Sequence, residues 1–157
     1  MYENWGSLFM QATNILFKNV LLVDDDMDEY HILQEALEEV STDLKVSFVN
    51  GGYKLDLSQP LEADIVFLDV NMPGCDGFEC LKKIRLAGYK VPVIMYTTSG
   101  HVDQIIKAYD MGATLFMIKP NGYSKLVNQM ERLFEHDWNN PEIISRSYFK
   151  DGNFIPV

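Results

Sequence analysis

Short apolar runs alternate with amphipathic segments through the middle of the sequence. Each run fits a strand buried on both faces, and each amphipathic segment repeats its apolar residues with the spacing of a helix. The predicted strands cover residues 19–23, 45–49, 65–68, 91–96 and 114–118. The predicted helices cover residues 28–40, 76–86, 102–109 and 124–135. This alternation predicts an α/β domain with a (βα)5 pattern, in which helices cover both faces of a parallel sheet.

Three stretches depart from this alternation. Residues 53–64 contain Pro60 and few helical repeats, so we expect a short or irregular helix there. Residues 1–18 form an N-terminal extension whose apolar positions fit one face of an amphipathic helix. Residues 138–157 form a mixed C-terminal tail that is suited to an extended strand and is too short for an output domain. The predicted central domain therefore spans residues 19–137.

Charge and composition exclude several classes of function. The sequence has 157 residues and a formal net charge of −10 at pH 7. Binding to a nucleic-acid backbone needs a basic face, so we expect no nucleic-acid partner. No apolar run approaches the length of a membrane span, and the first residues lack the pattern of a secretory signal, so we expect no membrane partner. Two cysteines, Cys75 and Cys80, are too few for a four-cysteine zinc site and fit the reducing cytoplasm.

Polar residues directly follow four of the predicted strands. They are the acidic triplet 24–26, Asp69, the hydroxyl residues 97–99 and the pair 119–120. The carboxyl ends of parallel strands lie at the same edge of a sheet, which is where open α/β folds bind ligands. Each element alone is a weak signal, but the ordered set after successive strands is much more specific. We therefore expect these side chains to form one site.

The residue types in this set point to phosphoryl chemistry. Crowded carboxylates repel one another unless a cation lies between them, and Mg2+ prefers carboxylate, carbonyl and phosphate oxygens. A carboxylate such as Asp69 is a feasible nucleophile toward phosphorus and would give an acyl phosphate. The transferred oxygens then need neutralising, for which Lys119 offers a charge and Thr97 a hydroxyl donor. Asp26 is interpreted as the residue that starts the following helix, not as a metal ligand.

Four segments carry a family resemblance. They are VLLVDDD at 20–26, IVFLDVNMPGCDGFECL at 65–81, PVIMYTTSG at 92–100 and GATLFMIKP at 112–120. In this order and spacing they resemble the receiver domain of two-component response regulators, and the resemblance covers residues 19–137. It implies a flavodoxin-like, doubly wound fold with a parallel sheet in the order 2-1-3-4-5.

The resemblance also implies roles for the residues at the expected site. Asp69 corresponds to the family's phosphoryl acceptor. Asp24 and Asp25 correspond to the acidic pair of its Mg2+ site, in which Asp25 would be a direct ligand and Asp24 would act mostly through water. Asn71 corresponds to the position whose backbone carbonyl completes the metal site. Lys119 corresponds to the lysine that pairs with the phosphate.

Two further positions correspond to the family's conformational switch. Thr97 matches the hydroxyl that is drawn to the phosphate. Phe116 takes the place of an aromatic residue that is often tyrosine. Pro120 suggests the cis Lys–Pro peptide bond seen in the family.

The resemblance implies a stand-alone, chemotaxis-receiver-like signalling protein of the cytoplasm. It would accept a phosphoryl group from a sensor histidine kinase or a histidine phosphotransfer protein, catalyse only its own phosphorylation and dephosphorylation, and signal by contact with a downstream protein that the sequence does not identify. Self-association as a homodimer stays open. Two alternatives also stay open, a receiver-fold adaptor that never uses phosphate and a Mg2+-dependent aspartyl-phosphate phosphatase. Such phosphatases carry a second acid two residues after the nucleophile, where this sequence has Asn71.

Overall fold

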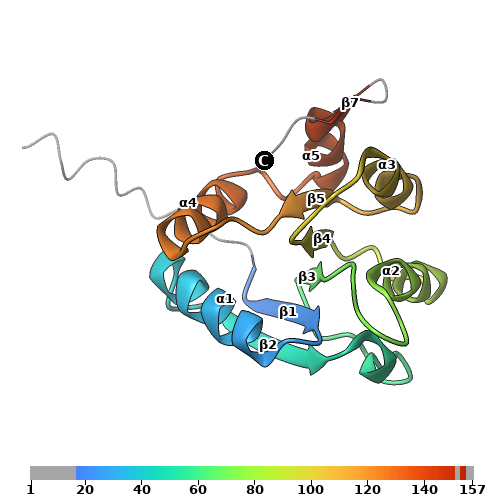
Figure 1. Ribbon diagram of the computed structural model, residues 1–157, viewed down its shortest axis with the longest axis horizontal. Helices are drawn as coiled ribbons and strands as arrows, with labels where there is room; N and C mark the ends of the chain where they lie inside the picture. Colours follow the sequence, from blue (N-terminus) through green and yellow to red (C-terminus); the bar gives the residue numbers. More distant parts are fainter. Residues whose placement is uncertain (1–16, 151–152, 155–157) are drawn as a thin grey trace, which may run out of the picture.

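The computed structural model describes residues 17–150 and 153–154 of the chain. Five parallel strands form one sheet in the order β2-β1-β3-β4-β5 (Figure 1). The strands are β1 (Asn19–Asp24), β2 (Lys45–Asn50), β3 (Ile65–Leu68), β4 (Val93–Thr97) and β5 (Leu115–Ile118). This order is the predicted one, and the (βα) alternation is that of a flavodoxin-like fold. The amphipathic pattern predicted for residues 1–18 lies almost wholly outside the described residues.

Helices cover both faces of the sheet. They are α1 (Met27–Val40), α2 (Gly77–Leu86), α3 (Val102–Asp110), α4 (Tyr123–Phe134) and α5 (Pro141–Tyr148). Figure 1 shows α1 and α4 on one face, α2 and α3 on the other, and α5 beside the edge strand β5. None of the helices among the described residues is long and apolar enough to cross a membrane.

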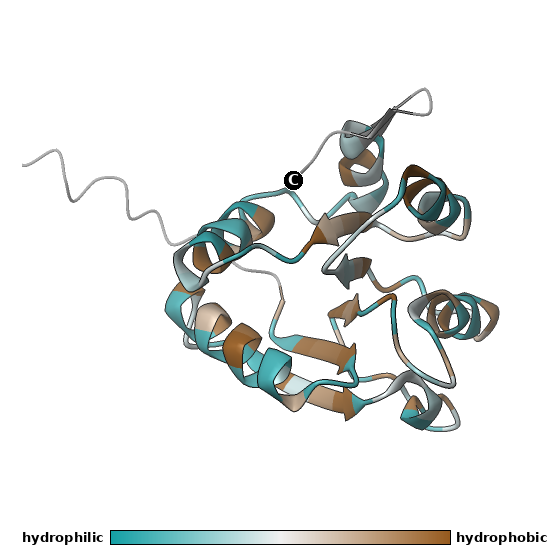
Figure 2. Ribbon diagram, viewed as in Figure 1, coloured by the Kyte–Doolittle hydropathy of each residue, from teal (hydrophilic) through white to brown (hydrophobic). Residues whose placement is uncertain are grey.

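The core has two halves, one on each face of the sheet. Val20 and Leu22 of β1 belong to the half under α1 and α4, while Leu21 and Val23 belong to the half under α2 and α3. This division follows from the alternation of side chains along a strand. Figure 2 shows the strands as mostly apolar and the helices as apolar on part of their surface only. Most residues of β1, β3, β4 and β5 are therefore buried, whereas the edge strand β2 has none that is fully buried.

The segment between β2 and β3 contains no α-helix. A single 3-10 turn, Gly52–Lys54, stands where the (βα)5 pattern would have its second helix, in agreement with the short or irregular helix expected there. A Cβ at Gly52 would lie 2.3 Å from the carbonyl oxygen of Cys75. The turn therefore packs tightly against the loop that follows β3.

Two expectations were wrong. The tail does not form only an extended strand, because residues 141–148 form α5, followed by the antiparallel pair β6 (Phe149–Lys150) and β7 (Asn153–Phe154). Pro141 suits the first turn of a helix, where its missing N–H costs nothing, and Ile144 is buried in the core. The Lys119–Pro120 bond is trans, since the described residues contain no cis peptide bond. The trans form is the more stable isomer of an ordinary X–Pro bond.

Candidate functional site

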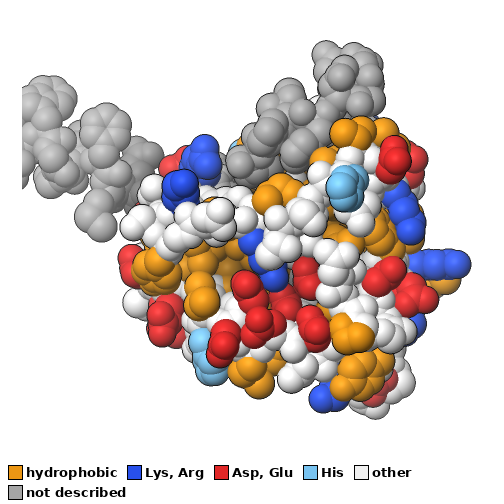
Figure 3. Space-filling view, viewed as in Figure 1, with side chains coloured by type: hydrophobic (Ala, Val, Ile, Leu, Met, Phe, Trp, Pro, Cys, Tyr) orange, Lys and Arg blue, Asp and Glu red, His pale blue; other side chains and the backbone are white. Residues whose placement is uncertain are grey.

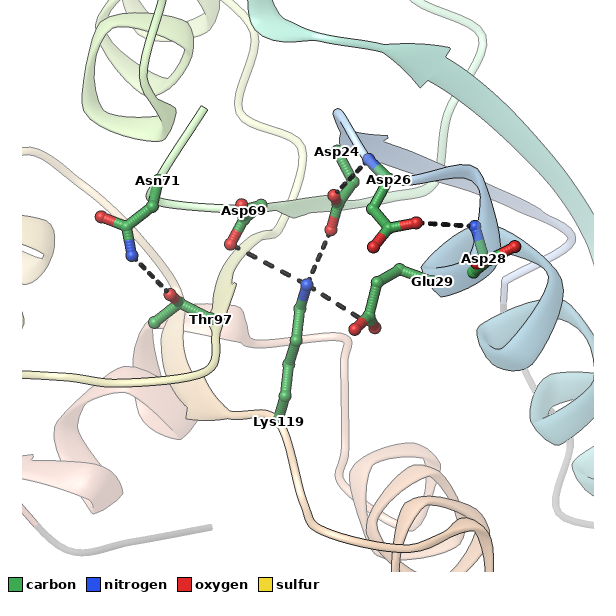
Figure 4. Close-up of polar contacts among 8 residues, drawn as sticks. All are labelled: Asp24, Asp26, Asp28, Glu29, Asp69, Asn71, Thr97 and Lys119. Atoms are coloured by element: carbon green, nitrogen blue, oxygen red, sulfur yellow. Dashed lines mark hydrogen bonds and ion pairs between the residues drawn. The ribbon is translucent and has the colours of Figure 1, made fainter. Parts of the chain in front are cut away.

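The loops after β1, β3, β4 and β5 meet at the carboxyl edge of the sheet (Figure 4). Backbone hydrogen bonds hold them in register. The N–H of Asp69 donates to the carbonyl of Val23 over 2.9 Å, and the N–H of Lys119 donates to the carbonyl of Thr97 over 2.7 Å. The side chains that follow neighbouring strands are therefore brought to one place by the sheet itself.

Three carboxylates form the centre of this site. Oxygens of Asp24, Asp25 and Asp69 all lie within 4.8 Å of one another. Asp24 and Asp69 are buried and Asp25 is exposed. Asp24 is held on both sides, because its Oδ1 accepts from the N–H of Asp26 over 2.9 Å and its Oδ2 accepts from Lys119 Nζ over 2.7 Å. The predicted acidic cluster thus exists in the fold.

The buried position of Asp69 makes its ionised form costly. Burial raises the pKa of Asp69 from 3.8 to about 6, against the lowering effect of the Lys119 charge, and the charges of Asp24 and Asp25 raise it further. The cluster therefore carries more negative charge than its surroundings compensate. Carboxylate oxygens at this spacing are the ligands that Mg2+ prefers, so the residues present fit a divalent cation.

Lys119 is the cation that the protein itself supplies. Its Nζ lies 2.7 Å from Asp24 Oδ2, 3.6 Å from Glu29 Oε2 and 3.9 Å from Asp69 Oδ1, and its side chain is 9% exposed. Burial opposes a charge on this lysine, but the hydrogen bond to Asp24 and the neighbouring negative charges raise its pKa above the ordinary value. The Lys119 Nζ also lies 5.6 Å from the centroid of the Tyr96 ring. Lys119 is therefore charged and directed into the carboxylate cluster.

The hydroxyl of Thr97 lies beside the cluster. Thr97 is fully buried at the end of β4, and its Oγ1 accepts from Asn71 Nδ2 over 3.3 Å. Phe116 is also fully buried, in the half of the core under α2 and α3. A Cβ at Gly100 would lie 2.6 Å from the Phe116 ring, so the loop after β4 packs closely on it. Phe116 thus lies inward, near Thr97 in the sheet but not among the carboxylates.

The face that carries this site is strongly acidic at its middle. Figure 3 shows a group of acidic side chains around a basic one, with apolar side chains on both sides of the group. The β1–α1 segment carries three exposed acids, namely Asp25, Asp26 and Asp28. An anionic ligand that approaches this edge of the sheet therefore needs positive charge close to Asp69.

Comparison with known proteins identifies the family. Residues 20–131 match the response regulator receiver domain. The chain belongs to this family. Receiver domains are signalling proteins, and the strand order described above is that of a receiver domain.

Several individual proteins are similar to this receiver domain. The DNA-binding transcriptional regulator NtrC of Escherichia coli is 32% identical over 117 residues, which are 74% of this chain and 25% of NtrC. The probable transcriptional regulator ycf29 of Porphyra purpurea is 29% identical over 141 residues, which are 88% of this chain and 66% of ycf29. The chain thus spans only a quarter of NtrC and two thirds of ycf29.

Solved structures show the same fold. The phosphorylated cyanobacterial phytochrome response regulator RcpA has a TM-score of 0.66 and 26% identity, with 75% of this chain and 91% of RcpA covered. The chemotaxis response regulator CheY4 of Vibrio cholerae has a TM-score of 0.62 and 27% identity, with 74% of this chain and 98% of CheY4 covered.

The carboxylates of Asp24, Asp25 and Asp69 and the Lys119 ammonium lie together, as the sequence predicts, and their roles stay predictions. Asp26 starts α1 as interpreted, because its side chain accepts from the N–H of Asp28 over 2.8 Å. The sequence did not single out Glu29, one position further, whose carboxylate is the second closest to Lys119 Nζ among the described residues. The sequence does contain a signal for Glu29, because Glu29 falls in the first turn of the helix that begins at the acidic triplet. That place puts its side chain within reach of the carboxyl edge of the sheet.

Proposed function

We propose that this receiver domain accepts a phosphoryl group on Asp69 from a histidine kinase or a histidine phosphotransfer protein. The observation that carries the proposal is the environment of one carboxylate. Asp69 is 7% exposed, lies 3.9 Å from the Lys119 ammonium, and shares its pocket with Asp24 and Asp25. A carboxylate with a raised pKa beside a lysine and two acids is an arrangement typical of a reactive group.

In the proposed reaction, the phosphorus–nitrogen bond of a phosphohistidine breaks as a bond forms between phosphorus and an Asp69 oxygen. The histidine nitrogen leaves with its electron pair. Lys119 offsets charge on the phosphoryl oxygens, and the Thr97 hydroxyl donates a hydrogen bond to one of them. Water then attacks the phosphorus, the bond between phosphorus and the Asp69 oxygen breaks, and inorganic phosphate leaves, which returns Asp69 to its carboxylate form. In this proposal the protein catalyses only its own phosphorylation and dephosphorylation.

The proposed cofactor of this reaction is a Mg2+ ion. The carboxylates of Asp24, Asp25 and Asp69 and the backbone carbonyl of Asn71 would hold it. When bound, it supplies positive charge for the phosphoryl oxygens and relieves the repulsion among the carboxylates.

The proposed signal is a shift between two conformations. Phosphorylation draws Thr97 away from Asn71 toward the phosphate and stabilises the inward Phe116. The surface of α3, β5 and α4 then contacts the downstream protein. Three exposed apolar residues lie on these elements, namely Val102, Ile118 and Tyr123. Phosphorylation-dependent NMR shifts confined to the opposite face would contradict this choice of surface. Sedimentation with and without beryllofluoride tests whether the same surface forms a homodimer.

The test uses acetyl phosphate and beryllofluoride in the presence of Mg2+. With acetyl phosphate, the wild type should gain the mass of one phosphoryl group, and Asp69→Asn should gain none. Asp25→Asn should need more Mg2+ for the same labelling. Asp26→Asn is the matched control, because it removes a charge from the same triplet while an asparagine still caps α1. Equal responses of the wild type and Asp69→Asn would favour a phosphate-independent adaptor instead.

A further inference from the structure

Glu29 occupies the third position of α1, after the cap residue Asp26. Its Oε2 lies 3.6 Å from Lys119 Nζ, a shorter distance than the 3.9 Å between that nitrogen and Asp69 Oδ1. The side chain of Glu29 is 34% exposed, so it lies at the mouth of the pocket. No role is assigned to this carboxylate by the phosphoryl chemistry proposed above.

The direction of the Glu29 side chain is not explained by helix capping. A glutamate at this position ordinarily accepts a hydrogen bond from the backbone N–H of the cap residue. Helix α2 has this arrangement, with Glu79 accepting from the N–H of Asp76 over 3.2 Å. In α1 the N–H of Asp26 donates to Asp24 Oδ1 instead. Glu29 is therefore released from the cap, and Figure 4 shows its carboxylate directed toward Lys119.

This contact holds the lysine on the β1–α1 side of the pocket. The Lys119 ammonium has Asp24 as its hydrogen-bond partner and Glu29 as its next carboxylate, and Asp69 is the most distant of its three acidic neighbours among the described residues. To pair with a phosphoryl group on Asp69, the ammonium has to leave part of this environment. Each carboxylate that competes for it raises the free energy of that movement.

We propose that Glu29 is a positioning residue that restrains Lys119 and thereby slows phosphorylation of Asp69. This inference rests on the proposed phosphoryl-acceptor function and adds a determinant of its rate. In the reaction with a small donor such as acetyl phosphate, the bond between phosphorus and the acetate oxygen breaks, acetate leaves, and phosphorus bonds to Asp69. Glu29 touches none of these atoms and acts through the lysine alone.

The test compares the full chain with Glu29→Gln and Asp28→Asn, which remove one charge each from adjacent positions. Asp28 is exposed, and its side chain is outside the ion pairs that the described residues make with Lys119. Labelling rates with acetyl phosphate are measured at saturating Mg2+ and physiological ionic strength, so that a change in metal affinity does not enter. Glu29→Gln should raise the rate by about two- to fivefold, the size expected for a partly exposed ion pair. Asp28→Asn should leave the rate unchanged.

A second measurement follows Lys119 itself. The side-chain Cε NMR signal of Lys119 should shift in Glu29→Gln and stay in place in Asp28→Asn, without phosphate or Mg2+. An unchanged rate in Glu29→Gln would overturn the inference, and equal acceleration by both variants would too, because a diffuse charge effect would then explain it. If the wild type takes no label at all, the proposed function fails, and the Lys119 signal still decides whether Glu29 positions this lysine.

Discussion

Removal of the Asp69 charge should stabilise the protein when divalent cations are absent. Burial raises the pKa of Asp69 from 3.8 to about 6. Between these two values the folded state keeps a proton that the unfolded state has released. Stability therefore falls as the pH rises through this window and stays low above it, because the folded protein then carries a buried carboxylate. Asp69→Asn removes this cost.

The magnitude follows from the size of the pKa change. A rise of about two pH units corresponds to about 3 kcal/mol of lost stability at pH 7.5, at about 1.4 kcal/mol per unit. At pH 4.5 the Asp69 carboxyl of the folded protein is mostly protonated. The same relation then gives a loss of stability of only about 1 kcal/mol. Asp69→Asn does not leave the Lys119 ammonium without an acidic partner, because Asp24 lies 2.7 Å from it. The midpoint of thermal unfolding should rise by roughly 5–10 °C at pH 7.5.

Urea denaturation in EDTA, at pH 7.5 and at pH 4.5, measures this effect. Asp43→Asn is the matched control, since Asp43 is exposed and its substitution should change stability by less than about 0.5 kcal/mol. Addition of Mg2+ should narrow the gap between Asp69→Asn and the wild type, because a ligand that binds the folded wild type better stabilises it more. A variant no more stable than the wild type at pH 7.5, or a gap that does not shrink at pH 4.5, would refute the reasoning.

Three further substitutions test contacts that stabilise the fold. Asp76→Ala removes the capping box of α2 and should lower the free energy of unfolding by about 1 kcal/mol in urea, whereas an unchanged value would mean that the cap contributes nothing. Arg85→Met removes four hydrogen bonds to backbone carbonyls and should cost about 2–4 kcal/mol, with exposed Lys82→Met as a nearly neutral control. Gly52→Ala places a methyl group against the Cys75 carbonyl and should lower the unfolding temperature in calorimetry; a wild-type temperature would show that the loop yields freely.

The sheet and the carboxylate cluster were predictable because they depend on strong local patterns. The segment Ile65–Leu68 is a continuous apolar run, and the structure gives the strand the same bounds. Parallel strands bring their carboxyl ends to one edge, so residues that directly follow strands meet there whatever the details of the loops. This is why Asp24, Asp69 and Lys119 were expected together from their positions alone.

The C-terminal helix was not predictable from its own residues. Helix α5 is short, and a helix of its length is unstable in isolation. It forms because it packs on the edge of the sheet, with Ile144 in the core and the Ser145 hydroxyl donating to the carbonyl of Thr114 over 2.8 Å. Neither contact has a signal in the tail sequence. The tail therefore resembled an extended segment until its partner strand was known.

The direction of Glu29 illustrates why the remaining part of the site escaped sequence reasoning. Local rules predict that a glutamate three residues after a cap aspartate turns back to the cap, as Glu79 does in α2. In α1 the cap N–H is occupied by Asp24, and the other oxygen of Asp24 is held by Lys119, which lies 95 residues further along the chain. A contact across the sheet thus decides a hydrogen bond at the start of a helix. Because the lysine both occupies Asp24 and attracts the released Glu29, the capping of α1 and the charge arrangement around Asp69 form one coupled system.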